Sequence, residues 1–309
     1  MHAQRNADCG SAKYGAKPVA AVLDKCGKKR ARRLRTCNIA AGILHAVSFV
    51  ASIVVTLFVL DDSVQTQLTT DFRVFNATAD GPPQAGPFSA RLEVLGYYQL
   101  VWVLLPFPFI TAAFHLAIAF VPALNARYTQ WTLAEGRNPL RWLEYSLSAS
   151  LMTWVICAIA GLTNVFQLAI VGVVLNVALQ YTGYQMEVSN ALAKRRNRAA
   201  VRWEPLIVGW LIFAAQWTLI WWYFFLTLAS ERPDTVPGPP WYVYTVVIGL
   251  FVQYAAFGFV HVGHFCGVTR RFRSAYLLEV GFITLSFTTK LFLTWNLLIG
   301  IATNRPSAL

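Results

Sequence analysis

The side chain best suited to chemistry is Lys290, near the middle of an apolar segment of membrane-spanning length, residues 277–301. An ionisable group at that depth costs several kcal/mol in hydrocarbon, which makes it a functional candidate. Snorkelling to the membrane surface suits lysines near helix ends, whereas Lys290 lies about twelve residues, roughly 18 Å, from either end. A desolvated lysine amine condenses with aldehydes, so Schiff-base formation is the chemistry to consider.

A Schiff-base cation in a low dielectric needs a carboxylate nearby. The best candidate is Glu144, early in another apolar segment and within the sequence RWLEYS. Glu144 also has a simpler interpretation, as an interfacial acid paired with Arg141 three residues before it. Glu187 and Glu279 lie nearer the ends of their segments, where we expect them to reach the interface.

Two histidines and a serine are expected at similar depth on the same side of the lysine. Ser286 lies one helical turn before Lys290 on the same face. His45 is early in the first apolar segment, and His115 is late in the second, which runs in the opposite direction. A cluster of this kind can hold water and transfer protons, although each histidine alone is as often a packing residue that bridges helices. His261 lies near the end of its segment, and we expect it to be interfacial.

The segments that must position these residues are long and apolar. The chain has 309 residues, 56% hydrophobic and 13% charged, against about 25% charged in soluble domains. This composition predicts an all-α membrane protein with seven transmembrane helices. We place the helices at 38–60, 97–121, 139–161, 165–187, 205–229, 241–265 and 277–301.

The basic residues predict the orientation. With the N-terminus in the cytoplasm, the cytoplasmic segments hold 21 of the 26 Lys and Arg and the outer segments hold four. That asymmetry favours a cytoplasmic N-terminus and an extracellular C-terminal tail, residues 302–309. The basic tail, residues 1–37, is expected to contact anionic lipid rather than nucleic acid, which a basic run can also bind.

The long outer loop, residues 61–96, exceeds the usual length of a connection between helices. Its segment 63–78 alternates β-branched and polar residues, which predicts a short β-hairpin between the first two helices. The turn-rich sequence GPPQAGP follows at 81–87, and Pro106 and Pro108 predict a kink in the second helix. The five cysteines show no metal-ligand spacing, so we expect neither a zinc site nor a disulfide framework.

The chain resembles the heliorhodopsins, retinal proteins of the microbial type, over residues 38–301. The sequences SFTTKLFLTWNL at 286–297 and RWLEYS at 141–146, together with the two histidines, carry the resemblance. An inverted orientation and a long outer loop with hairpin character are features of that family. The third helix holds no second carboxylate after Glu144, which argues against a proton pump.

The resemblance implies a role for each candidate residue. Lys290 would carry all-trans retinal as a protonated Schiff base, with Glu144 as its counterion. His45 and His115 would line an inner polar cavity that receives or stabilises the proton after light. The other residues expected at the chromophore are Ser286, Tyr145, Asn176, Phe257 and Trp295.

The implied function is light sensing by a non-enzymatic photoreceptor in the plasma membrane. The resemblance also implies a homodimer, and a sensor would signal to an unidentified cytoplasmic partner. Two alternatives stand beside it. One is a light-gated proton channel or transporter, and the other is a non-photoactive seven-helix receptor or scaffold in which Lys290 is a buried ion-pair partner.

Overall fold

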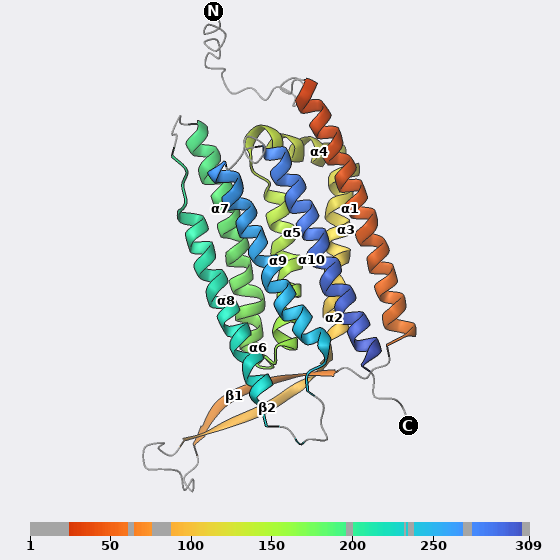
Figure 1. Ribbon diagram of the computed structural model, residues 1–309, viewed down its shortest axis with the longest axis vertical. Helices are drawn as coiled ribbons and strands as arrows, with labels where there is room; N and C mark the ends of the chain where they lie inside the picture. The colour runs from red at the N-terminus through yellow and green to blue at the C-terminus, as the bar shows by residue number, and fades with distance from the viewer. Residues whose placement is uncertain are drawn as a thin grey trace, which may run out of the picture.

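The protein is a bundle of long helices with a two-stranded antiparallel sheet at one end (Figure 1). The computed structural model describes residues 25–60, 65–75, 88–195, 200–231, 233, 238–267 and 274–304. The elements in chain order are α1 (Lys25–Phe58), β1 (Gln65–Phe75), β2 (Phe88–Gln99), α2 (Leu100–Leu104), α3 (Pro106–Phe120), α4 (Pro122–Thr129), the π-helical turn η2 (Gln130–Glu135), α5 (Pro139–Ile159), α6 (Val165–Gln167), the π-helical turn η3 (Leu168–Val174), α7 (Leu175–Arg195), α8 (Glu204–Ala229), α9 (Trp241–Cys266) and α10 (Ala275–Thr303).

Seven spans in the described residues are long and apolar enough to cross a membrane, which confirms the predicted fold class. The second span combines α2 and α3, and the fourth combines α6, η3 and α7. The predicted interruption by proline lies between α2 and α3, because α2 ends at Leu104 and α3 begins at Pro106. Proline suits the first turn of a helix, where its missing N–H would have had no partner.

Helix α1 is far longer than a membrane requires. Its 34 residues extend about 51 Å, against about 30 Å of hydrocarbon. Residues 25–37 of the predicted tail therefore belong to the helix, whose start projects beyond the bundle (Figure 1), whereas residues 1–24 lie outside the described part. Leu34 is buried against Ile118 and Tyr128, while the charged side chains Lys28, Lys29, Arg30, Arg32, Arg33 and Arg35 are exposed.

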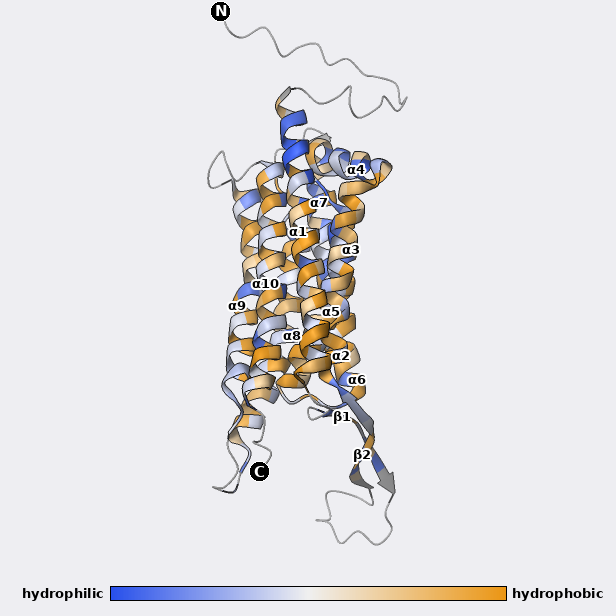
Figure 2. Ribbon diagram, turned by 90° about the vertical axis from the view of Figure 1, so that its right-hand side faces the viewer, coloured by the Kyte–Doolittle hydropathy of each residue, from blue (hydrophilic) through white to orange (hydrophobic). Residues whose placement is uncertain are grey.

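The two ends of the bundle differ in these features. We call the end where α1 begins the basic end, and the opposite end, beside β1 and β2, the hairpin end. Figure 2 shows hydrophilic residues at the start of α1 and largely apolar residues along the flank of the bundle. Large apolar side chains such as Val47, Leu211 and Phe259 are more than half exposed there, as expected of a surface that faces lipid.

The β-hairpin is present, but its second strand lies outside the segment 63–78 in which it was predicted. Strand β1 pairs with β2, which follows the turn-rich segment 81–87, and Gln65 is opposite Gln99 at the open end. That turn-rich segment lies outside the described residues. A register shift occurs between Leu68 and Thr69. The loop after α5 holds the sheet in place, because Thr69 N donates to Thr163 O at 2.9 Å.

The short connection between α5 and α6, with the sequence GLTN at 161–164, makes these helices neighbours. Gly161 adopts a φ of 104° there, in the region that favours glycine. Asn164 caps the next helix, since its side chain accepts from the backbone N–H groups of Phe166 and Gln167 at 2.9 and 3.2 Å. The Asn164 amide also donates to Asp71 of β1, which ties the hairpin to the bundle.

The interior divides into an apolar half and a polar half. The largest buried apolar cluster fills the hairpin half and includes Leu104, Ile156, Leu250 and Leu297. The buried charged residues Arg141, Glu144, Glu187, Glu279 and Lys290 come from α5, α7 and α10. The structure therefore concentrates its ionisable groups between the middle of the bundle and the basic end.

Candidate functional site

Lys290 and Glu144 meet inside the bundle. Lys290 Nζ lies 2.6 Å from Glu144 Oε1, and the two side chains are 3% and 5% exposed. Glu144 Oε1 also accepts a hydrogen bond of 2.6 Å from Thr111 Oγ1. Helices α10, α5 and α3 thus contribute one group each. The lysine amine occupies the place that the iminium nitrogen of a Schiff base would take.

The alternative pairing of Glu144 with Arg141 does not occur. Arg141 instead forms ion pairs with Glu187 of α7 and Glu279 of α10. Glu144 therefore forms its ion pair with Lys290. Each of the two cations has at least one carboxylate beside it, which buried charges require.

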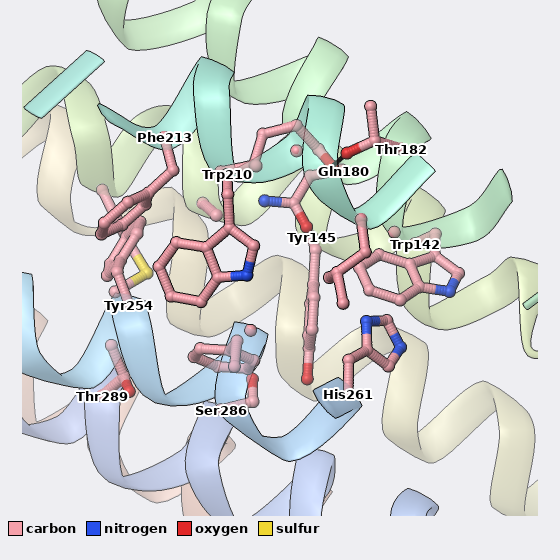
Figure 3. Close-up of a pocket in the computed structure, with 18 of the residues that line it drawn as sticks. Trp142, Tyr145, Gln180, Thr182, Trp210, Phe213, Tyr254, His261, Ser286 and Thr289 are labelled. Atoms are coloured by element: carbon pink, nitrogen blue, oxygen red, sulfur yellow. Dashed lines mark hydrogen bonds between the residues drawn. The ribbon is translucent and has the colours of Figure 1, made fainter. Parts of the chain in front are cut away.

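A cavity extends from this ion pair between α5, α7, α8, α9 and α10. Its volume is about 100 Å³. Of the residues proposed from the sequence, Lys290, Ser286, Tyr145 and Phe257 line it. Its other aromatic walls were missed, and they are Trp142, Trp210, Phe213 and Tyr254. Figure 3 shows them around one space, with Ser286 and Thr289 on the α10 side.

Three features of the cavity suit a long apolar aldehyde attached to Lys290. The amine lies at its wall, and six Phe, Tyr and Trp side chains are among the other residues that line it. Glycines on three different helices, Gly183, Gly209 and Gly258, lie in the lining and let neighbouring side chains pack directly against the backbone. A Cβ at Gly258 would lie 2.5 Å from the ring of Trp210, and one at Gly183 would lie 2.4 Å from that of Trp142. Retinal therefore fits the chemistry of these residues.

Two residues proposed from the sequence lie away from the cavity lining. Asn176 is buried and donates from Nδ2 to Ser150 Oγ at 3.0 Å. Its contact with Gln180 at 3.4 Å reaches a residue that does line the cavity. Trp295 is partly buried against the apolar cluster of the hairpin half. Neither side chain lines the cavity.

His45 and His115 lie together between α1 and α3. Their rings stack with centroids 6.2 Å apart and an interplanar angle of 4°. The ring of Phe287, from α10, meets His45 edge-on at 5.3 Å. His115 Nδ1 lies 2.7 Å from Asn38 Oδ1, whereas neither ring nitrogen of His45 has a hydrogen-bond partner within the described residues. The expected histidine pair is thus present as a structural cluster.

A second buried ionic cluster surrounds Arg141. Its two acids were expected at the membrane interface, but they are buried. Glu187 and Glu279 are 1% and 3% exposed. His261, also expected at the interface, is 3% exposed and lies 3.5 Å from Glu187. Helix α7 continues to Arg195, beyond its predicted end at residue 187, so Glu187 lies inside the bundle. Glu279 is buried because Arg141, Tyr128 and Asn138 surround its carboxylate. The sequence could have predicted this cluster, because Arg141, Glu187 and Glu279 lie at matching depths in their helices.

Polar groups from α4 and from the N-cap of α5 complete this cluster. Asn138 donates from its backbone N–H to Glu187 Oε2 and from Nδ2 to Glu279 Oε1, both at 2.8 Å. Tyr128 donates to Glu279 Oε1 at 3.1 Å. Burial and the neighbouring carboxylate of Glu279 raise the pKa of Tyr128 well above its usual range, so this hydroxyl keeps its proton and acts as a donor.

Seven membrane-spanning helices with a buried lysine–carboxylate pair beside an apolar cavity define the rhodopsin class of membrane proteins. The transmembrane domain of a rhodopsin phosphodiesterase from Salpingoeca rosetta has a similar fold, with a TM-score of 0.59 and 11% sequence identity over 93% of this chain and 92% of that one. No curated protein matches the chain in sequence. The family model of the heliorhodopsins matches residues 34–302, and the chain belongs to that family. Membership indicates a retinal photoreceptor.

Proposed function

We propose that the chain is a light sensor in which all-trans retinal is held by Lys290, and that Glu144 is the counterion. The observation that carries the proposal is the position of Lys290, whose amine lies at the cavity wall and 2.6 Å from the Glu144 carboxylate. When bound as a protonated Schiff base, retinal supplies light absorption and a change of shape.

The residues around Lys290 Nζ provide the proton chemistry. Glu144 stabilises a positive nitrogen, and Thr111 holds the carboxylate in place through its 2.6 Å hydrogen bond. The ring of Tyr145 lies 5.2 Å from the nitrogen, close enough for a cation–π contact. Ser286 lines the cavity one turn away, and its hydroxyl has no hydrogen-bond partner in the described part of the chain.

The histidine pair is the proposed acceptor region for a proton released from Lys290 Nζ. His45 has two ring nitrogens without partners, so it can bind a proton without breaking an existing hydrogen bond. Asn38 fixes the ring of His115 at 2.7 Å. A proton held here and later returned to Lys290 would produce a slow cycle suited to signalling.

Orientation, location and partners are further parts of the proposal. The 21-to-4 distribution of Lys and Arg supports a basic end in the cytoplasm and a hairpin end outside. The plasma membrane is the proposed location. The exposed basic helix of α1 offers a surface to a cytoplasmic signalling partner. Exposed apolar residues on β2, such as Leu92 and Tyr97, offer a surface for a homodimer.

The first test is the visible spectrum of membranes that contain the chain and all-trans retinal. We expect a visible band that hydroxylamine bleaches in light. Lys290→Ala should abolish this band and leave the protein in the membrane, whereas Lys29→Ala, on the exposed basic helix, should leave it unchanged. A folded wild-type protein without a band would contradict the proposal and favour the receptor or scaffold alternative.

The second test addresses the counterion. Glu144→Gln removes the negative charge and keeps the shape, so a nitrogen that stays protonated should absorb further to the red. If it loses its proton instead, the visible band should decrease and a near-ultraviolet band should appear. An unaltered spectrum across neutral pH would show that Glu144 is not the counterion.

A further inference from the structure

The fourth membrane span changes its winding at the π-helical turn η3. In such a turn each N–H bonds to the carbonyl five residues before it, instead of four. The last bond of this kind runs from Leu175 N–H to Ile170 O. Where bonding returns to four residues, one carbonyl is passed over, and at this junction it is that of Val171. Turns of this type occur mostly as single insertions in α-helices and often lie at functional sites.

A side chain from the neighbouring helix satisfies this carbonyl. Gln216 of α8 donates from Nε2 to Val171 O at 2.7 Å, and the two residues are 0% and 2% exposed. Gln216 Oε1 has no hydrogen-bond partner among the described residues, so burying this amide is costly. The bond to Val171 O accounts for its presence, because backbone groups within a membrane must be satisfied inside the protein.

The extra residue in the turn changes which side chains of the span face α8. Before the turn, Tyr223 of α8 donates to Gln167 Oε1 at 2.7 Å. After it, Leu179 and Thr182 are the side chains closest to Gly209 of α8. In an unbroken α-helix these two would lie about 120° and about 60° around the axis from Gln167. One inserted residue removes about 100°, which brings them to about 20° and about 40° on either side of it.

The same rotation decides which α7 residues reach the cavity. Gln180 and Gly183 line it, and Figure 3 shows the amide of Gln180 among the aromatic walls. Without the inserted residue, Leu179 and Thr182 would take these two places. A side chain at the place of Gly183 would meet the ring of Trp142, since a Cβ there lies 2.4 Å from it. The cavity therefore depends on the inserted residue in η3.

We propose that Gln216 is a positioning residue for the chromophore, because its hydrogen bond to Val171 O keeps the inserted residue in η3 and so fixes the rotation of α7. The inference rests on the proposed retinal function, since it concerns the cavity in which retinal would lie. Gln216 does not line that cavity. It acts through Gln180 and Gly183 of α7, and it lies three residues from Phe213, which lines the cavity from α8.

A simpler explanation is that Gln216 only fills space between α7 and α8. The two explanations differ in one respect. If Gln216 serves the inserted residue, it should become dispensable once that residue is removed. Ile170 is suited to deletion, because it lies in the middle of η3 and is 53% exposed. Its removal leaves an unbroken α-helix in which the residues before and after the turn keep their faces.

The test compares four proteins with all-trans retinal, namely the wild type, Gln216→Met, the deletion of Ile170, and both changes combined. Methionine keeps the length of glutamine and has no N–H donor. We expect Gln216→Met to shift the visible band and to raise the rate of bleaching by hydroxylamine in the dark at least about tenfold, the factor that about 1.4 kcal/mol produces. Deletion of Ile170 should keep both near the wild type, and adding Gln216→Met to it should change neither.

Gln130→Met is the matched control, because Gln130 is exposed at the basic end and its amide donates to Glu135 at 3.1 Å. It should match the wild type in band and bleaching rate. If Gln216→Met does not fold in the wild-type chain, the combined variant should restore folding.

A Gln216→Met protein with the wild-type band and bleaching rate overturns the proposal. A combined variant as impaired as Gln216→Met alone overturns it too, since Gln216 would then matter in a helix that has no freed carbonyl. A deletion variant without a visible band has the same meaning, because it shows that Ile170 is not an extra residue. A wild-type protein without the band is instead a failure of the photoreceptor proposal, and the midpoint of unfolding by sodium dodecyl sulfate then gives the same comparison of four proteins.

Discussion

Replacing Arg141 by methionine should destabilise the bundle strongly. The guanidinium lies between Glu187 and Glu279, and all three side chains are at most 5% exposed. Removing one partner of a buried ion pair costs about 3–5 kcal/mol. Here two carboxylates lose their partner, but one of them can bind a proton, so the loss stays near that range rather than doubling. It corresponds to two to more than three orders of magnitude in the unfolding constant.

Two further variants separate charge from packing. Glu279→Gln leaves a neutral pair of Arg141 and Glu187, and we expect a loss of only about 1 kcal/mol. Combining Arg141→Met with Glu187→Gln and Glu279→Gln removes every charge from the cluster. This triple variant should recover most of the stability that Arg141→Met loses, because uncharged replacements of buried ion clusters are often neutral.

Reversible unfolding of the purified protein by sodium dodecyl sulfate, followed by circular dichroism, measures these free energies. The visible band gives a second measure of unfolding, since α5 and α10 carry residues of both the Arg141 cluster and the lysine–carboxylate pair. Arg141→Met within 1 kcal/mol of the wild type would refute the electrostatic reasoning. A triple variant as unstable as Arg141→Met would show that lost packing against Phe282, whose ring lies 4.0 Å from the guanidinium, is the real cause.

Two more predictions concern the cavity wall and the hairpin. In Gly258→Ala the new Cβ would lie 2.5 Å from the Trp210 ring, so the indole must move. We expect a shifted visible band and a free energy of unfolding lower by about 1–3 kcal/mol. Gly281→Ala, whose new Cβ would have its nearest atom at 3.8 Å, should match the wild type in the same spectrum. Asn164→Ala removes a helix cap and the hydrogen bond to Asp71, and should lower the free energy of unfolding by about 1–2 kcal/mol; an unchanged unfolding midpoint would contradict it.

The sequence predicted the helices well because their length and apolar composition are dictated by the membrane. The central pair was predictable for the same reason, since Lys290 and Glu144 are ionisable groups at depths where few others occur. The strand β2 was harder to place. Its sequence includes the exposed apolar residues Leu92, Val94 and Tyr97, so it does not show the clean alternation of a strand with one buried face.

The walls of the cavity could not be chosen from the sequence. With 21 Phe, 12 Tyr and 11 Trp in the chain, aromatic density fits many positions. Ser286 and Lys290 share one face of α10, but Trp295 follows Lys290 by five residues, about 140° around the helix, and lies outside the lining. Trp210 and Phe213 face the cavity only because of how α8 is rotated against α7 and α9, which no local pattern records.

The Arg141 cluster also has a consequence for the order in which the chain is synthesised. Arg141 and Glu187 lie in helices made early, and they already neutralise one another when α5 and α7 meet. Glu279 and Lys290 are synthesised about ninety and about one hundred residues after Glu187, or roughly 5–20 s later at ordinary rates of synthesis. Until then Glu144 has no cation beside it. The last helix brings one charge of each sign, so its docking neutralises Glu144 and adds no net charge to the interior. A chain truncated before α10 therefore retains an unpaired carboxylate within the membrane, which distinguishes it from the complete protein.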